Sequence, residues 1–174
     1  MHQELMHSTD DEILEVVDEN DVVVGLATRK EIHQKKLIHR AVHIFLFNSA
    51  GSLFVQRRSP RKDTHPLKLD SSAAGHVDPG ERYVDAAARE LYEELGLRAQ
   101  LEEVLRLPPS EETGFEHVVL YATCTDLTPL VDPDEIIEGS FVPPQELSAK
   151  MSQNADDFVP AFLRLWERYQ GRRV

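Results

Sequence analysis

The feature that most constrains this chain is a glutamate-rich segment, GHVDPGERYVDAAARELYEELGL, at residues 75–97. Apolar residues recur in it at helical intervals, which predicts a helix over about residues 82–95. The expected core-facing stripe consists of Val84, Ala87, Ala88, Leu91 and Leu95. Gly96 is placed to end the helix in the left-handed conformation that glycine adopts easily. The segment therefore predicts an amphipathic helix packed on a core.

A neighbouring face of this helix carries three carboxylates. Glu90, Glu93 and Glu94 stand at i, i+3 and i+4, so they share one side of the helix, where like charges repel. Such a face is either a solvated acidic surface or a site for hard cations such as Mg²⁺ or Mn²⁺, which prefer carboxylate oxygens. Glu81 adds a fourth carboxylate at the start of the helix, and Arg89 can pair with it.

The chain as a whole is acidic and has a globular composition. Its 174 residues include 31 acidic and 19 basic side chains, for a net charge of −12, with 41% hydrophobic residues. We expect one domain, 1–174, with residues 1–12 polar and mobile. The negative charge repels nucleic acid and anionic membranes, so we expect neither as a partner. An acidic protein that binds phosphates needs a basic cluster, a helix N-terminus or bound metal ions.

The N-terminus and the cysteine content favour a cytoplasmic location. MHQELMHSTDDE lacks the apolar region of a secretory signal, and no apolar run approaches the roughly 20 residues of a membrane span. Cys124 is the single cysteine, which excludes an internal disulfide and fits a reducing compartment. We expect Cys124 to be a small buried residue late in a strand.

The remaining sequence predicts several strands and two further helical segments. Strands are expected as a hairpin within 14–29, as a second hairpin within 43–59 that turns at Asn48–Gly51, and at 101–107, 116–124 and 136–142. Residues 30–39 are read as a short helix or loop, and 155–169 as a helix with a core stripe of Phe158, Phe162, Leu165, Trp166 and Tyr169. Pro143 and Pro144 end the last strand. These elements predict an α+β domain.

The segment at 75–97 resembles the Nudix box, G-x5-E-x7-R-E-U-x-E-E-x-G-U, where U is apolar. Every specified position matches: Gly75, Glu81, Arg89, Glu90, Leu91, Glu93, Glu94, Gly96 and Leu97. The resemblance implies an α/β/α sandwich with a mixed sheet, and hydrolysis of a nucleotide or nucleoside diphosphate derivative. It also implies Mg²⁺, with Mn²⁺ as an alternative, held by Glu90, Glu93 and Glu94 and supported by the Gly75 carbonyl and Glu81.

The hydrolysis that this resemblance implies requires a base to take a proton from water. Glu93 and Glu94 are the candidates within the box, with Arg89 to orient the carboxylates. Glu116 is the best candidate outside it, because it begins a predicted strand. Glu111 and Glu112 are weaker alternatives on a loop.

A wider resemblance, over roughly residues 14–142, is to the isopentenyl-diphosphate isomerases, which share the Nudix fold. His39 and His76 match isomerase metal histidines, His33 lies near a third, and Glu116 matches a glutamate that holds the metal. The isomerase cysteine is replaced by Ala74, and the box is complete where isomerases have an eroded one. Hydrolysis is therefore the leading interpretation. The alternatives are an isomerase-like enzyme and a non-catalytic diphosphate-binding module.

A basic loop, RRSPRKDTHPLK at 57–68, is expected to contact the phosphates of a small diphosphate substrate. Its basic side chains are Arg57, Arg58, Arg61, Lys62 and Lys68. Consecutive strand residues face opposite sides, so at most one of Arg57 and Arg58 should point into the site. The hairpin within 14–29 is a candidate interface for a homodimer.

Overall fold

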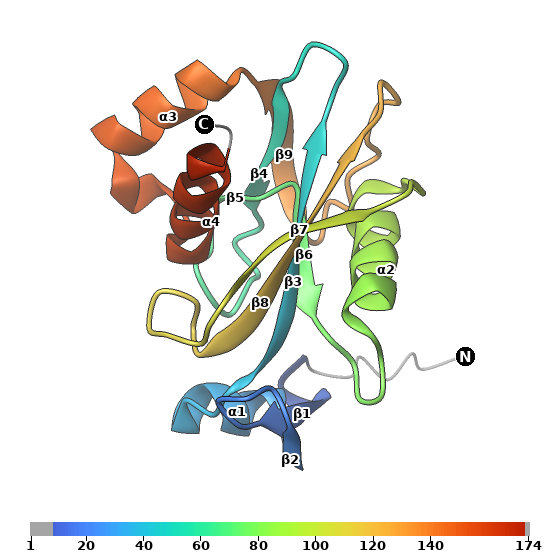
Figure 1. The fold of residues 1–174 in the computed structure, drawn as a ribbon, viewed down its shortest axis with the longest axis vertical. Helices are drawn as coiled ribbons and strands as arrows, with labels where there is room; N and C mark the ends of the chain where they lie inside the picture. The colour runs from blue at the N-terminus through green and yellow to red at the C-terminus, as the bar shows by residue number, and fades with distance from the viewer. Residues whose placement is uncertain (1–8, 173–174) are drawn as a thin grey trace, which may run out of the picture.

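A mixed β-sheet lies between helices on both of its faces in the computed structural model, which describes residues 9–172 (Figure 1). Helix α2 (Tyr83–Leu95) covers one face, and α3 (Pro144–Gln153) and α4 (Pro160–Gly171) cover the other. The expected α/β/α sandwich of the α+β class is confirmed. None of the described helices is long and apolar enough to cross a membrane.

The large sheet branches around its central strand. Its strands are β3 (His39–Phe47), β4 (Leu53–Arg58), β5 (Leu69–Asp70), β6 (Ala73–His76), β7 (Glu102–Leu107), β8 (Glu116–Cys124) and β9 (Ile136–Val142). Strand β3 runs parallel to β8 on one side, and β7 extends that side. On the other side β3 pairs with β6, and it meets β4 only at Phe47 and Leu53. The expected hairpin within 43–59 therefore forms but opens at once, and β4 pairs instead with β5 and β9.

Alternation along β3 divides the core into two clusters. Phe45 faces the helices near the C-terminus and packs with Phe162 and Trp166. Ile44 and Leu46 point to the opposite face and join the cluster under α2. Because side chains alternate along a strand, Ala41 and His43 lie on the same face as Phe45. Both of them line the main pocket, so the strand that builds the core also builds the pocket floor.

A small hairpin and a short helix precede the large sheet. Strands β1 (Ile13–Val17) and β2 (Val23–Thr28) pair as expected, and Asp18 accepts hydrogen bonds from two backbone N–H groups of the turn. Helix α1 (Arg29–Lys35) follows, capped by Thr28. A 3-10 helix, η1, covers Thr9–Asp11. Of residues 1–12, which were expected to be mobile, Thr9–Asp11 form this helix and Glu12 pairs with Arg29, whereas residues 1–8 lie outside the described residues.

The buried face of α2 differs from the expected stripe. Ala87, Leu91 and Leu95 are buried as predicted, but Val84 and Ala88 are exposed and Ala86 is buried. The buried face of the helix is rotated relative to the expected stripe, so that it includes Glu94 on the side that faces the pocket. Gly96 ends the helix with φ 66°, as expected. As a result, Val84 and Ala88 are exposed to solvent, and the Glu94 carboxylate lies in the pocket.

The helix expected at 155–169 is confirmed in its main part as α4, although a 3-10 helix, η2 (Ala155–Asp157), precedes it and Phe158 is buried outside both. Helix α3 was not expected from the sequence. Pro144 and Pro160 each occupy a first-turn position, where proline begins a helix instead of breaking one. One expectation in this half is wrong. Cys124 is exposed instead of buried, because it is the last residue of β8, where the strand leaves the covered part of the sheet.

Candidate functional site

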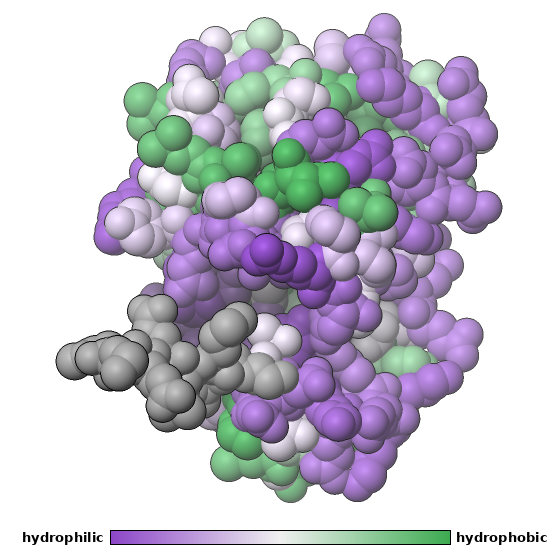
Figure 2. All heavy atoms as spheres, turned by 180° about the vertical axis from the view of Figure 1, so that it is seen from behind, coloured by the Kyte–Doolittle hydropathy of each residue, from purple (hydrophilic) through white to green (hydrophobic). Residues whose placement is uncertain are grey.

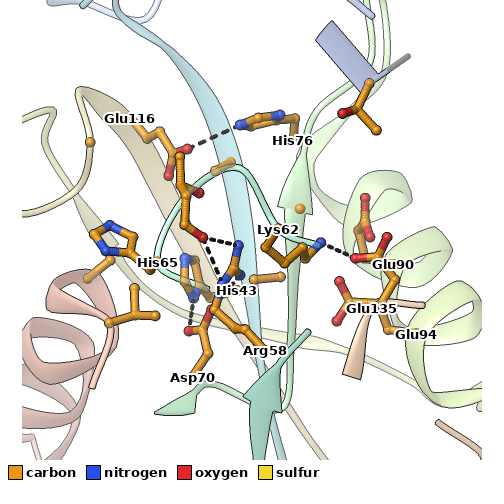
Figure 3. Close-up of a pocket in the computed structure, with 18 of the residues that line it drawn as sticks. His43, Arg58, Lys62, His65, Asp70, His76, Glu90, Glu94, Glu116 and Glu135 are labelled. Carbon is orange, nitrogen blue, oxygen red and sulfur yellow. Dashed lines mark hydrogen bonds and ion pairs between the residues drawn. The ribbon is translucent and has the colours of Figure 1, made fainter. Parts of the chain in front are cut away.

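A charged pocket of about 640 Å³ opens between the branches of the sheet and α2. Figure 3 shows that Glu90, Glu94 and Glu135 gather at its α2 side, whereas His76 and Glu116 lie across the pocket from them. We call Glu90, Glu93, Glu94 and Glu135 the carboxylate half of the site. We call His33, His39, His76 and Glu116 the histidine half.

Gly75 lets strand β6 approach the carboxylate half. A Cβ atom at residue 75 would lie 2.1 Å from Oε1 of Glu90, which is far inside van der Waals contact. Any other residue would push the Glu90 side chain or the strand away. The glycine that opens the motif is therefore required by a close approach and not by a turn.

Arg89 ties the loop before α2 to the helix. Its Nε and Nη2 donate to the two carboxylate oxygens of Glu81, each at 3.0 Å. Nη2 also donates to the backbone carbonyl of His76 at 3.0 Å, and Nη1 donates to Glu90 at 2.7 Å. Burial opposes ionisation of Glu81, but the hydrogen bonds from Arg89 hold its pKa below the usual value. The expected pairing of Arg89 with Glu81 is therefore present, and Arg89 also holds Glu90.

Glu94 is buried and the Glu90 side chain is only 12% exposed, and neighbouring cations do not fully offset the cost of burying their negative charge. Burial raises the pKa of Glu90 to about 7, against the opposing effect of Arg89. Burial and the proximity of Glu90 raise the pKa of Glu94 well above its ordinary value. Glu94 is 4% exposed and accepts a hydrogen bond from the Gln56 amide at 3.0 Å. Such a set of oxygen donors fits a hard divalent cation, which would restore the charge balance.

The histidine half is assembled from four elements. The imidazoles of His33, His39 and His76 place one nitrogen each within 4.8 Å of one another. Oε1 of Glu116 lies 3.2 Å from Nε2 of His39 and 3.3 Å from Nε2 of His76. Nε2 of His39 is buried and has no hydrogen bond of acceptable geometry. Among residues 9–172, these histidines form the one group of three or more ligating side chains that converges this closely.

Charge is balanced within the histidine half. Burial opposes ionisation of Glu116, yet the two imidazoles hold its pKa well below the usual range. Burial opposes protonation of His39, but Glu116 raises its pKa. Burial lowers the pKa of His76. The carboxylate stays ionised between its two neighbours, in contrast to the carboxylates on α2.

The basic loop divides between the pocket and the surface, as strand alternation predicts. Arg57 points away and pairs with Glu138 at 2.8 Å and Asp157 at 3.1 Å. Arg58 lines the pocket, where Asp70 holds its guanidinium at 3.0 Å. Lys62 lines the pocket as well. The other two basic side chains lie outside the lining: Arg61, which pairs with Asp134, and Lys68.

Two polar residues of the site, Gln56 and Glu135, were not expected from the sequence. Gln56 donates to Glu94 and shares a strand face with Arg58, so period-2 alternation from Arg58 could have found it. Glu135 lines the pocket beside Glu94 and pairs with Lys62. It lies on a loop before β9 and far from the motif in sequence, so no local pattern marks it. Glu112 also lines the pocket, whereas Glu111 does not.

Comparison with known proteins places this geometry in a family. A NUDIX domain family model matches residues 37–162, which include the whole of the carboxylate-bearing helix and its preceding loop. The chain belongs to the Nudix family. Membership supports an enzyme of the pyrophosphohydrolase type and agrees with the use of a divalent cation such as Mg²⁺.

Relatives of this chain are named either as Nudix hydrolases or as isopentenyl-diphosphate Δ-isomerases. An uncharacterised Nudix hydrolase of Pseudomonas aeruginosa is 40% identical over 139 residues, which cover 79% of this chain and 82% of that protein. An isopentenyl-diphosphate Δ-isomerase of Pectobacterium atrosepticum is 32% identical over 152 residues, 84% of this chain and 85% of that one. A crystal structure from Deinococcus radiodurans has a TM-score of 0.73 and 34% identity, and covers 82% of this chain and 90% of that one.

Proposed function

We propose that this Nudix protein is a Mg²⁺- or Mn²⁺-dependent hydrolase that cleaves the diphosphate linkage of a nucleotide or nucleoside diphosphate derivative. The observation that carries the proposal is a pair of carboxylates with raised pKa values, the buried Glu94 and the largely buried Glu90, which line a pocket that Arg58 and Lys62 also line. A pocket with both signs of charge suits an anionic substrate that a cation bridges to carboxylates. We treat residues 1–174 as one catalytic unit.

The residues that would hold the cation are those of the box. Glu90, Glu93 and Glu94 supply carboxylate oxygens, with the Gly75 carbonyl and Glu81 in support. Mg²⁺ and Mn²⁺ take such hard oxygen ligands, and a bound ion would neutralise phosphate charge and lower the pKa of a coordinated water. Arg89 keeps Glu81 and Glu90 in place through its hydrogen bonds, so its role is positioning.

A carboxylate then takes the proton of the attacking water. Glu93 is the best placed, because its side chain is 56% exposed in the pocket lining, where water can reach it. Glu94 is too buried to exchange a proton with solvent easily. Glu116 is held between two imidazoles, so its low pKa makes it the weaker base. It remains a candidate for positioning water or substrate from the histidine half.

The substrate phosphates would meet Arg58 and Lys62. A guanidinium binds phosphate oxygens in a fork, and Asp70 fixes the Arg58 side chain for that purpose. Arg57 and Arg61 are engaged in ion pairs outside the pocket lining, and Lys68 also lies outside it, so we assign them no contact with substrate.

The test is turnover of a substrate panel by the purified protein with Mg²⁺ or Mn²⁺. The panel contains nucleoside di- and triphosphates, nucleotide sugars, dinucleotides, coenzyme A and isopentenyl diphosphate. Metal-dependent release of phosphate or a nucleoside monophosphate from one class, lost in Glu94→Gln, is the expected result. Ligand-induced stabilisation in thermal melts with no turnover would favour a non-catalytic diphosphate-binding module.

The second candidate function is isomerisation of isopentenyl diphosphate. The observation that favours it is the convergence of His33, His39 and His76 beside Glu116. In the isomerase resemblance His39, His76 and Glu116 match metal-binding residues, and His33 lies near a third metal histidine. Ala74, which also lines the pocket, opposes it, because an alanine cannot transfer a proton. Incorporation of solvent deuterium into isopentenyl diphosphate without phosphate release would establish this function instead.

We also propose a homodimer formed through the β1–β2 hairpin, and a cytoplasmic location. The hairpin exposes a row of large apolar residues, Ile13, Val22, Val23, Val24 and Leu26, at the lower end of the molecule, where Figure 2 shows hydrophobic side chains. Among the described strands β2 pairs with β1 alone, so its other edge is free to pair with a second copy. Light scattering of the protein and of Leu26→Glu tests this dimer, which the substitution should dissociate.

A further inference from the structure

Lys62 reaches the carboxylate half from the basic loop. Its ammonium group forms an ion pair with Glu135, and its side chain is only 18% exposed. Its charge also favours ionisation of both Glu90 and Glu94. Figure 3 shows the Lys62 side chain reaching from its loop toward these three carboxylates. The chain thus provides its own cation where the proposed function requires a metal ion.

Both ion pairs and hydrogen bonds hold the loop that carries Lys62. Two consecutive ion pairs, Arg61–Asp134 and Lys62–Glu135, connect it to the segment before β9. A backbone hydrogen bond from Ser59 to Glu135 anchors its start at 2.9 Å. A lysine has a long flexible stem, so the ammonium can leave the carboxylates while the start of the loop stays in place.

We propose that the Lys62 ammonium is a built-in counterion of the carboxylate half, which a divalent cation displaces on binding. The inference rests on the metal site of the proposed function. Without a metal ion, Glu90, Glu94 and Glu135 repel one another, and Lys62 neutralises part of that charge. A divalent cation held by Glu90 and Glu94 would repel the ammonium, which is paired with the neighbouring Glu135 in the same partly buried site, so the two cations compete.

Displacement has a consequence for substrate binding. Arg58 lines the same pocket, so a released Lys62 joins a second cation that faces the substrate. Binding of the metal ion therefore frees a phosphate-binding group, and the two ligands should bind with positive coupling. Coupling of this kind is reciprocal, so the diphosphate should increase metal affinity by the same factor.

Calorimetric titration of the metal-free protein with Mn²⁺, in the absence of substrate, is the first test. Lys62→Met should bind Mn²⁺ about fivefold more tightly or better, because the competing charge is gone. Arg61→Met is the matched control, since it breaks the neighbouring ion pair of the same loop without removing a charge from the carboxylates, and its Kd should equal that of the wild type.

The outcomes separate this inference from the proposed function. A Kd for Lys62→Met equal to or weaker than that of the wild type would overturn the counterion role alone. An absence of Mn²⁺ binding to the wild type would overturn the metal site and this inference together. A similar gain in Arg61→Met would assign the effect to loosening of the loop and so would also overturn the counterion role.

A second measurement uses the native chain, so it does not depend on the folding of a variant. Lysine acetylation is followed by mass spectrometry with and without saturating Mn²⁺, with the exposed Lys35 on α1 as the internal reference. Lys62 should become more reactive relative to Lys35 when Mn²⁺ binds. An unchanged or lower reactivity of Lys62 would show that the ammonium stays among the carboxylates and would overturn the proposal.

Discussion

The two halves of the pocket are built in different ways. Glu90, Glu93 and Glu94 lie on one turn of one helix, and the loop that supports them directly precedes it. The histidine half draws on α1, β3, β6 and β8, and is created by sheet register, which pairs His39 with Glu116 across β3 and β8. One half is therefore a local motif, whereas the other exists only because strands distant in sequence become neighbours.

The halves also differ in how their charge is balanced. Glu116 has two imidazoles within 3.3 Å and a lowered pKa. Glu90 and Glu94 have raised pKa values, because burial exceeds the help of Arg89 and Lys62. Carboxylates with raised pKa values need an added cation to stay ionised near neutral pH, whereas Glu116 is already kept ionised by its two imidazole neighbours. Metal dependence should therefore reside mainly in the α2 half.

The largest expected effect comes from Glu94→Gln. Turnover with Mg²⁺ should fall about 100- to 1,000-fold, because a metal-binding charge is lost from the proposed site. Glu102→Gln, on the exposed edge strand β7, is the matched control and should keep wild-type kcat. Near-normal kcat in Glu94→Gln would break the assignment of metal chemistry to the α2 half.

The same variant has an expected effect on stability. Burial raises the pKa of Glu94, so the folded protein binds this proton more tightly than the unfolded chain does, and that stabilisation is lost as pH rises through the folded pKa. Metal-free Glu94→Gln should therefore melt higher than the wild type at pH 8, with a smaller difference at pH 5. Thermal melts at the two pH values measure it, and a lower melting temperature at pH 8 would contradict it.

Gly75→Ala should affect metal binding next most strongly. The added Cβ would lie 2.1 Å from Oε1 of Glu90, so this carboxylate has to move, and Mn²⁺ affinity should fall about 10- to 100-fold. Gly25→Ala is the control, because its Cβ meets nothing within 4 Å. Calorimetry decides the point, and equal affinities in the two variants would remove Gly75 from the site.

A smaller effect is expected from Glu116→Gln. Hydrolysis should fall only about tenfold, because Glu116 positions groups from the histidine half without holding the proposed cation. The measurement is kcat under saturating Mg²⁺, with circular dichroism to confirm folding. A loss as large as that of Glu94→Gln would mean that the histidine half takes part in the chemistry, and the division of roles would fail.

The smallest change should be in KM, and it should differ between variants at two adjacent arginines, Arg57 and Arg58. Arg58→Ala should raise KM about tenfold through loss of a charged hydrogen bond, whereas Arg57→Ala should leave KM within about twofold. Arg58→Ala also leaves Asp70 buried without its partner, so the double variant Arg58→Ala with Asp70→Asn controls for stability. Equal KM values for the two single variants would exclude Arg58 from phosphate binding.

Much of the fold follows from patterns of the sequence. The alternation of apolar residues correctly predicted the strands of both hairpins, and Gly96 correctly predicted the end of α2. Both predictions depend only on residues close together in the sequence. The helix α3 was not predicted, because Pro144 was read as a stop although proline is also a first-turn residue. The exposure of Cys124 was also missed, since alternation does not tell where a sheet ceases to be covered.

The sequence alone was enough to predict the carboxylate helix, the pairing of Arg89 with Glu81, and that only one of Arg57 and Arg58 faces the pocket. These depend on helical and strand periodicity, which fix the side that a residue faces relative to its near neighbours. Only the tertiary structure decided that Glu94 is buried, that Glu135 and Lys62 join it, and that three histidines converge on Glu116. Burial, charge balance and the convergence of ligands depend on which distant segments pack together. Periodicity contains no information about that packing, because it describes only how residues close in sequence face one another.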